Sequence, residues 1–382
     1  MEQIDKQLSF KIRLLSLVSM ILVVYVHAYT LDLNGYAGAL TEHKNYNTFI
    51  QDFISHGVAR VATPLFFTVS GFLFFIGFKP KAAVILQKIN KRISSLLIPF
   101  LLWSAFGIGL YYVLQLFPPI TPYFPNRIIR DMSFEQLLTT LVLHPIPYQL
   151  WFLRDLMILA LVAPAVWLFV KYLQENFLAL LAVTWFADLD FGIFVSESLL
   201  FFSLGCYLKL NPDLVAKLKT NYNFLPVLLG WLGLLIFKTE LSFLGYDNQL
   251  VLMLLHKLAI VTGFVATWQC INRVVDKTRI VNRKWLFSAV SPFFIYAFHE
   301  PLLTICKKGL LLILYSGTDI TSLLVYLFAP IVVILASIMA GEILRRTTPG
   351  FFQVITGNRD KPAESPLVNT PAQTQLLVKT QA

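Results

Sequence analysis

The sequence has few charged residues for its length. Only 14% of its 382 residues are Asp, Glu, Lys or Arg, whereas 57% are hydrophobic and the mean hydropathy is +0.69. Soluble domains carry about 25% charged residues, so this composition excludes one. The charge that is present is mainly positive, with a formal net charge of +10. In a membrane protein this excess reports the orientation of the spans, and we expect no nucleic-acid partner.

Cysteine pairs and strand-like alternation are also lacking. Cys206, Cys270 and Cys306 all lie inside apolar runs, without a second cysteine or a histidine at ligand spacing. We expect small core residues there, and neither a disulfide framework nor a metal site. Apolar and polar residues do not alternate at strand period, which argues against a barrel and favours helices. No cleavage pattern follows the first apolar run, so it is expected to remain as a signal anchor.

Long apolar runs recur along the chain and predict an all-α membrane protein with a bundle of about ten transmembrane helices. Their approximate ranges are 12–33, 58–78, 95–117, 150–171, 177–191, 194–210, 222–239, 250–270, 285–306 and 321–344. With both termini in the cytoplasm, 22 of the 31 Lys and Arg residues fall on the cytoplasmic side, as the positive-inside rule requires. Residues 1–357 are then a single transmembrane domain. The Pro-, Thr- and Gln-rich tail 358–382 is expected to be disordered in the cytoplasm.

Three loops carry further signals. The cytoplasmic loops 79–92 and 273–284 hold much of the inner charge, and topology and contact with anionic lipids alone can explain both. The longest outer loop, 118–149, begins with prolines and continues as an amphipathic segment. This pattern predicts a short interfacial helix or a lid on the outer face. No internal repeat is evident, which weakens a transporter built on inverted repeats.

One ionisable residue, His27, lies in the otherwise apolar second half of the first span. Such a side chain is costly in hydrocarbon and usually faces a bundle interior or a cavity, so His27 is a candidate site residue. The alternative is a histidine that only reaches the interface or bonds a neighbouring helix. Other spans bring ionisable residues to the same outer side: Arg60, Arg154, Asp155, His256, Lys257, His299 and Glu300. Their convergence predicts a polar cavity that opens outward.

Several of these residues also have a purely structural interpretation. Arg154 and Asp155 point about 100° apart on a helix, so one of them can simply reach the interface. Snorkelling or structural pairing is the simpler explanation for Lys257 and Glu300. The small pair Ser70-Gly71 in the second span can serve close helix packing alone.

The second span contains the run RVATPLFFTVSG, from Arg60 to Gly71. It resembles the R-x-x-x-P-L-F-F-x-x-S-G signature of the acyltransferase family 3 integral-membrane O-acyltransferases, in particular those that modify bacterial surface polysaccharides. The likeness continues in the family's order over residues 10–358. It includes Lys91-Arg92 before Leu97-Ile98-Pro99-Phe100, Leu150-Trp151-Phe152-Leu153, Leu204-Gly205-x-Tyr207-Leu208, Tyr296-x-x-His299-x-Pro301, Arg345-Arg346-x-x-Pro349 and Thr356-Gly357.

One position departs from the family pattern. Members typically carry a basic residue eleven positions before the first-span histidine, where this chain has Ser16. Arg13 lies fourteen positions before His27, about 40° from its azimuth on a helix and one turn closer to the cytoplasm. Arg13 is therefore predicted to take the place of the usual basic residue.

The resemblance implies a multi-pass O-acyltransferase of the inner (plasma) membrane. It is expected to move an acyl group, with acetyl as the leading candidate, from acetyl-CoA or another acyl-CoA to a hydroxyl of a surface or lipid-linked glycan. His27 is the expected base, because imidazole titrates near neutral pH, or else the group that transiently carries the acyl. The predicted substrate-binding residues are Arg60, Ser70, Trp151, Arg154, Tyr296 and His299, and the predicted acyl-CoA-binding residues are Arg13, Lys91 and Arg92. No permanently bound cofactor and no metal is expected.

Two questions stay open from the sequence. CoA is cytoplasmic whereas His27 lies toward the outer leaflet, so either the pantetheine arm threads between the spans or the acyl group is relayed. A transporter or flippase of a lipid-linked sugar, or a non-catalytic membrane subunit of a polysaccharide synthesis system, would share this composition. A transporter or flippase predicts broken spans in matching halves of the chain. A non-catalytic subunit has no need of His27 together with the complete second-span motif.

Overall fold

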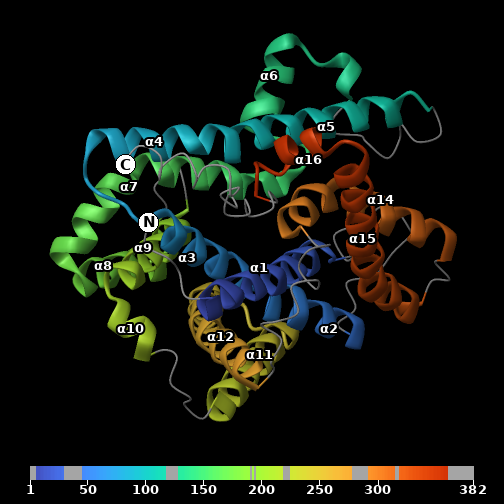
Figure 1. Ribbon diagram of the computed structural model, residues 1–382. Helices are drawn as coiled ribbons and strands as arrows, with labels where there is room; N and C mark the ends of the chain where they lie inside the picture. The colour runs from blue at the N-terminus through green and yellow to red at the C-terminus, as the bar shows by residue number, and fades with distance from the viewer. Residues whose placement is uncertain are drawn as a thin grey trace, which may run out of the picture.

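The fold is described from a computed structural model, for residues 6–29, 45–117, 128–189, 192, 195–217, 224–277, 291–314 and 318–359. Within these ranges the chain forms helices and short helical turns and no strand. The prediction of an all-α protein is therefore confirmed. Figure 1 shows the helices gathered into one bundle, with α1 running through its middle.

The helices follow one another along the chain in this order. They are α1 (Lys6–His27), α2 (Tyr46–Ser55), η2 (Val58–Val61), α3 (Ala62–Phe74), α4 (Ala82–Arg92), η3 (Ile93–Leu97), α5 (Ile98–Gln115), η5 (Ile129–Asp131), α6 (Phe134–Val142), η6 (Tyr148–Leu150), α7 (Trp151–Leu173), α8 (Glu175–Phe186), α9 (Ser196–Leu210), α10 (Pro212–Lys217), α11 (Phe224–Phe243), α12 (Gln249–Lys277), α14 (Pro292–Leu314), α15 (Asp319–Thr347) and α16 (Pro349–Ile355). The η3 segment is π-helical and joins α4 to α5, whereas the other η segments are 3-10 turns.

Seven helical stretches of the described chain are long and apolar enough to cross a bilayer, so this is a multi-pass membrane protein. They are Gln7–His27, Tyr46–Phe74, Ala82–Gln115, Tyr148–Leu173, Phe224–Phe243, Gln249–Val275 and Asp319–Thr347. The other three predicted spans coincide with α8 and α9, which have 12 and 15 residues, and with α14, which is broken at Glu300. The count of ten therefore stays a prediction.

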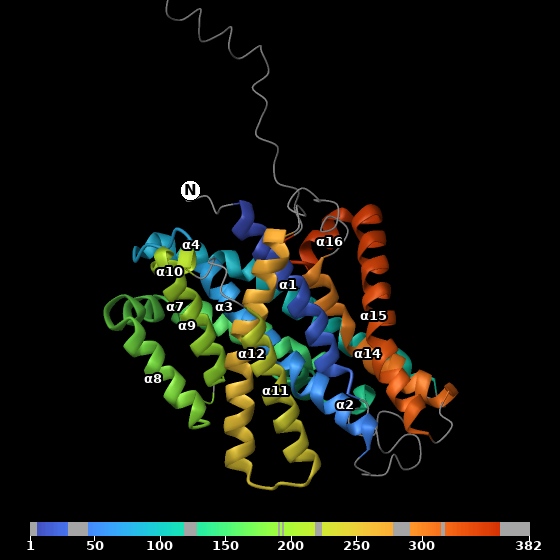
Figure 2. The same ribbon diagram turned by 90° about the horizontal axis from the view of Figure 1, so that it is seen from below.

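The bundle has two distinct ends (Figure 2). The start of α1, helices α4, α10 and α16, and the last turns of α12 and α15 lie at one end, which we call the inner side. Helix α2 and the turn between α11 and α12 lie toward the opposite, outer side. This grouping is the one that the basic residues predict, and the assignment of the inner side to the cytoplasm remains a prediction. The tail after residue 359 and much of the loop 273–284 lie outside the described residues.

The predicted amphipathic segment of the outer loop is helix α6. Its N-cap is Ser133, whose hydroxyl accepts from the amide of Gln136 at 3.2 Å, while the Gln136 side chain accepts from the Ser133 amide at 2.8 Å. This reciprocal pair is a capping box, which the sequence S-x-x-Q provides. Phe134 and Leu138 on one face of α6 are exposed. The proline-rich start of the loop lies outside the described residues.

The crossing of α3 and α9 is closed by two glycines. A Cβ atom on Gly71 would lie 2.2 Å from the carbonyl oxygen of Phe202, and one on Gly205 would lie 2.2 Å from that of Thr68. Both distances are shorter than any real contact, so the two helices can approach this closely only where a side chain is lacking. The second-span motif and the later L-G-x-Y-L run therefore meet in space, and Gly71 is explained by packing.

The end of the domain is held against the start of α5. The indole nitrogen of Trp103 donates to the carbonyl oxygen of Ile355 at 3.0 Å. Gly357 has a positive φ of 65°, and a Cβ there would lie 2.5 Å from the carbonyl oxygen of Ser95 in the π-helical turn. Glycine is the residue that meets both conditions without strain. Residues up to Gly357 thus belong to the packed bundle.

Candidate active site

His27 is the last residue of α1, and its backbone is fixed by a lysine from another helix. The final carbonyl groups of a helix lack partners within the helix. Lys307 of α14, a buried side chain, donates from Nζ to the carbonyl oxygen of His27 at 2.7 Å and to that of Tyr29 at 2.9 Å. A cation is also favoured at a helix C-terminus. Lys307 therefore holds the turn that carries the histidine.

The imidazole of His27 is held by two aromatic neighbours. Its Nδ1 atom lies 2.9 Å from the hydroxyl of Tyr148, and the two rings are perpendicular. His299 of α14 stacks on it, with ring centroids 5.5 Å apart and planes 21° from parallel. No residue in the described ranges bonds its Nε2 atom. When the hydroxyl oxygen of Tyr148 accepts a hydrogen bond from Nδ1–H, Nε2 carries a lone pair and can act as a base.

A break in α14 places His299 beside His27. Glu300 has non-helical dihedral angles, φ −108° and ψ 136°, and Pro301 follows it. A break at membrane depth is tolerated when other groups bond the freed backbone. Here Nε2 of Gln149 donates to the carbonyl oxygens of Ala297 at 3.3 Å and Glu300 at 3.2 Å. One side chain thus bonds carbonyl groups just before the break and at it.

The tautomer of His299 follows from its contacts. Its Nδ1 atom lies 3.1 Å from the carbonyl oxygen of Ile295, which can only accept, so Nδ1 carries the proton. The Nε2 atom of His299 is buried and has no hydrogen-bond partner among the described residues. Together with Nε2 of His27, it gives this region two imidazole nitrogens without a described partner.

The short turn η6 connects both histidines. Its first residue, Tyr148, contacts His27, and the next residue, Gln149, bonds the break in α14. In return the hydroxyl of Tyr296 donates to the carbonyl oxygen of Gln149 at 2.5 Å. The site residues predicted from the sequence do not include Tyr148, Gln149 or Lys307. The available signals were two polar residues directly before the L-W-F-L run and a lysine inside an apolar stretch.

Arg60 stands at the start of α3, at the end of the turn η2, with an exposed side chain. It interacts electrostatically with His27 and with Glu197 of α9. Its guanidinium makes no hydrogen bond or ion pair within the part of the chain that the structure describes. Arg60 is thus close enough to His27 to act on it electrostatically, and its substrate-binding role stays a prediction. Glu197 is a further charged residue here that sequence reasoning missed.

The other predicted substrate residues have mainly structural contacts. Tyr296 is buried and bonded through its hydroxyl, and the half-buried Trp151 packs near Phe67, with ring centroids 6.2 Å apart. A guanidinium nitrogen of Arg154 lies 3.7 Å from the buried carboxylate of Asp155. Ser70 is half-buried on α3, and no hydrogen bond of its hydroxyl to a described residue is seen.

Lys257 shows the structural pairing that the sequence had suggested for it. Its Nζ atom lies 2.6 Å from Asp188 Oδ1 and 2.6 Å from the carbonyl oxygen of Trp185, and it is buried.

The predicted acyl-CoA residues lie at the inner side, away from His27. Arg13 is exposed and stands fourteen residues, about 21 Å, from His27 along α1. Lys11, two residues earlier on the same helix, is buried. The guanidinium of Arg92 lies over the ring of Phe74, 5.1 Å from its centroid, and Lys91 is exposed. The structure therefore does not bring these three residues to the histidines.

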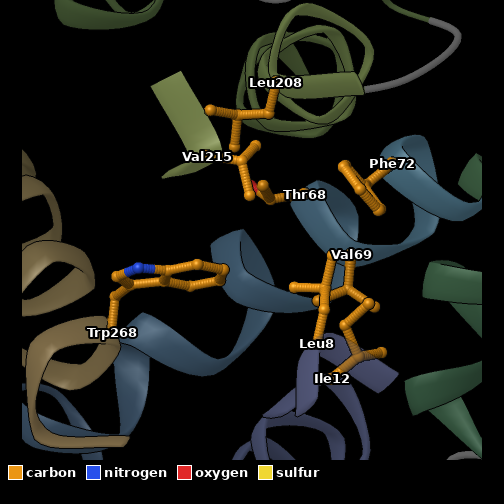
Figure 3. A pocket seen from close by; sticks show the side chains of 8 residues that line it. All are labelled: Leu8, Ile12, Thr68, Val69, Phe72, Leu208, Val215 and Trp268. Carbon is orange, nitrogen blue, oxygen red and sulfur yellow. The ribbon is translucent and has the colours of Figure 1, made fainter. Parts of the chain in front are cut away.

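A small cavity near the inner side has an apolar lining (Figure 3). It is lined by Leu8, Ile12, Thr68, Val69, Phe72, Leu208, Val215 and Trp268, which come from α1, α3, α9, α10 and α12. The hydroxyl of Thr68 is bonded to the carbonyl oxygen of Pro64 at 2.9 Å. Such walls offer nothing to a sugar or a phosphate. Within the described residues no cluster of His, Cys, Asp or Glu could hold a metal ion.

Fold and site together define a multi-pass membrane protein with a histidine centre between its helices. The acyltransferase domain of family 3 matches residues 11–342, and the chain belongs to this family. A curated relative is the succinoglycan biosynthesis protein ExoH of Rhizobium meliloti (strain 1021). It is 27% identical over 365 residues, which cover 93% of this chain and 94% of the relative. No solved structure gives a significant match.

Proposed function

We propose that this protein transfers an acyl group, acetyl first of all, from acyl-CoA to a hydroxyl of a surface or lipid-linked glycan, in the inner (plasma) membrane. Membership of the acyltransferase family supports the reaction class. The similar protein of Rhizobium meliloti is named for the biosynthesis of a glycan, which supports the class of acceptor. The observation that carries the proposal is the imidazole of His27, held at Nδ1 by Tyr148 and without a described partner at Nε2.

In this reaction Nε2 of His27 takes the proton of the acceptor hydroxyl. The hydroxyl oxygen attacks the acyl carbonyl carbon, the carbon–sulfur bond breaks, and the CoA thiolate leaves and receives the proton from the imidazolium. A positioned base contributes about 10²- to 10⁴-fold to such a step. Arg60 stabilises the oxyanion that forms on the acyl carbonyl, because its guanidinium donors are unused by the described chain.

Several side chains act by holding these groups. Lys307 fixes the end of α1, and Gln149 fixes the break in α14 that positions His299. His299 stacks on His27 and thereby holds the plane of that imidazole. The alternative in which His27 itself carries the acyl group uses the same nitrogen, and the same contacts would orient it.

The direct test is mass spectrometry of surface glycans from cells with and without this protein. We expect a mass difference equal to one acyl group on a sugar of the glycan, which also identifies the acyl chain. Identical glycans in both strains, with the protein present in the membrane of the first, would contradict the proposal. Acylation of an accumulated lipid-linked intermediate would place the acceptor before polymerisation.

A further inference from the structure

A second group of ionisable side chains lies beside the histidine centre, between α2, α11 and α12. It contains Lys238 of α11, His256 of α12, and His56, which directly follows α2. The ring of His56 lies 4.6 Å from that of Tyr29, two residues after His27, so the two groups adjoin. Lys238 and His256 lie a few residues from the turn between α11 and α12, at the outer side (Figure 2).

The contacts of Lys238 are unusual for a cation inside a bundle. Its Nζ atom donates to the carbonyl oxygen of His56 at 2.8 Å and lies 3.2 Å from Nδ1 of His256. A protonated lysine can only donate, so Nδ1 of His256 accepts and that ring is neutral. Two basic side chains are thus in contact. The ammonium group of Lys238 also has a third N–H group, which neither of these two interactions uses. Arg60, which interacts electrostatically with both Lys238 and His256, adds a second cation.

Two of the nearby carboxylates form ion pairs with other residues. Asp52 accepts from His56 Nδ1 at 2.9 Å, and Asp188 pairs with Lys257 at 2.6 Å. Glu197 interacts with both Arg60 and Lys257. Across the described ranges, neither Lys238 nor Arg60 forms an ion pair with a carboxylate. Asp52 acts on Lys238, and Glu197 on Arg60, only electrostatically and without an ion-pair contact. An intramembrane cation that no carboxylate contacts is costly, and such residues usually mark a substrate path.

We propose that Lys238, beside His56 and His256, forms a subsite for an anionic group of the acceptor glycan. The anion is the carboxylate of an acidic sugar or the phosphate of a lipid-linked one, since both accept charge-assisted hydrogen bonds from Lys and Arg. The subsite lies at the outer side, whereas the acyl-CoA of the proposed function enters from the inner side. This inference rests on the proposed function only in treating the bound glycan as the acceptor of the acyl group.

The test is a binding measurement by calorimetry on the purified full-length protein. The probe is a fragment of the deacylated surface polysaccharide of the producing cells, used in its native form and after reduction of its carboxylates to alcohols. A second probe pair is the fragment linked to a polyprenyl phosphate and the fragment linked to the same polyprenyl chain without the phosphate. For wild type we expect the anionic member of one pair to bind about tenfold or more tighter than its neutral counterpart, as for a hydrogen bond to a charged group.

Three variants sharpen the result. Lys238→Met should abolish the preference for the anionic probe, and Lys238→Arg should retain most of it. Lys171→Met is the matched control, because Lys171 lies over the ring of Trp167 on α7 and takes no part in the cluster. A preference in the carboxylate pair assigns the anion to an acidic sugar, and a preference in the phosphate pair assigns it to the lipid carrier. Equal binding within both pairs would overturn the proposal, as would an unchanged preference in folded Lys238→Met.

Failure of this proposal is separable from failure of the proposed function. Wild-type protein that binds the anionic probe selectively but transfers no acyl group leaves the subsite standing and rejects the acyltransferase. Wild-type and Lys238→Met proteins that acylate native and reduced acceptors equally well leave the acyltransferase standing and reject the subsite.

Discussion

Two lysines fix the ends of two helices, one at each side of the bundle. Lys307 donates to the carbonyl oxygens of His27 and Tyr29 at the end of α1. Lys88 of α4 does the same at the end of α3, where its Nζ atom lies 2.7 Å from the carbonyl oxygen of Phe74 and 2.9 Å from that of Ile76. Both contacts satisfy carbonyl groups that a helix end leaves unpaired, and both place a cation where the helix dipole favours one.

The difference between the two lysines lies in what each helix end carries. The end of α1 carries an imidazole with a nitrogen that no described residue bonds, whereas the end of α3 carries phenylalanines packed in the apolar core. A lysine that bonds the end of a neighbouring helix is therefore not by itself a substrate ligand. Its importance for the reaction depends on the group that it holds, and this distinction can be tested.

The largest effect is expected for His27. His27→Ala should lower kcat by about 10²- to 10⁴-fold, because it removes the proposed base while the apolar helix stays intact. Acyl transfer by purified protein, corrected for the amount in the membrane, measures it. His144→Ala is the control, since His144 is exposed after α6. Wild-type acylation by well-inserted His27→Ala protein would reject the assignment of the base.

The next effect separates the two lysines. Lys307→Met should lower kcat by about 10²-fold, because a displacement of a catalytic group by about 1 Å produces a loss of that size. Lys88→Met removes an equivalent helix-end contact and should leave kcat of the folded fraction within about twofold, because α3 ends far from the histidines. Steady-state rates on monodisperse protein decide between them.

Equal losses of activity in Lys307→Met and Lys88→Met would contradict this distinction, since the two contacts would then matter only for stability. Lys307→Arg is expected to recover part of the lost rate, because a guanidinium can also donate to two carbonyl oxygens.

A smaller effect is expected for the tyrosine that orients the imidazole. Tyr148→Phe keeps the ring contact with His27 and removes the hydroxyl at Nδ1. A typical hydrogen bond contributes about 1 kcal/mol, so kcat should fall about fivefold while the KM for the donor stays constant. Tyr112→Phe at the exposed end of α5 is the control. An unchanged kcat in Tyr148→Phe would show that the imidazole is oriented by other contacts.

The sequence predicted the helical class and the elements that carry His27, Arg60 and His299, because hydrocarbon-length apolar runs leave few other solutions. It also allowed the packing interpretation of Gly71. Contacts between segments that lie far apart in the sequence could not be predicted from it. Gln149 and Lys307 are recognisable only when the break in α14 and the end of α1 are seen in place, because their partners are backbone carbonyls, which have no sequence signal.

Arg13 shows a further limit of prediction from the sequence. A helical wheel places Arg13 near the azimuth of His27, and the structure leaves the side chain exposed while Lys11 is buried. Azimuth alone does not fix burial at the end of a helix, because the neighbours change along its length. Likewise, helix α2 with His56 falls in a stretch that the sequence assigned to a loop, so the Lys238 cluster could not be foreseen.

The smallest effect is expected at the inner side, where the acyl donor is predicted to enter. CoA carries phosphates, and Lys91 and Arg92 stand directly before the π-helical turn at the start of α5. Arg92→Ala should raise the apparent KM for acyl-CoA about threefold with little change in kcat, since it removes ground-state binding alone. The stacking of Arg92 on Phe74 offers a competing structural role. Lys91→Ala is the matched variant, because Lys91 is exposed and removing it disturbs no such contact. An unchanged KM with a reduced yield of Arg92→Ala protein would show that this cation, like Lys88, stabilises the inner end of the bundle and does not bind the donor.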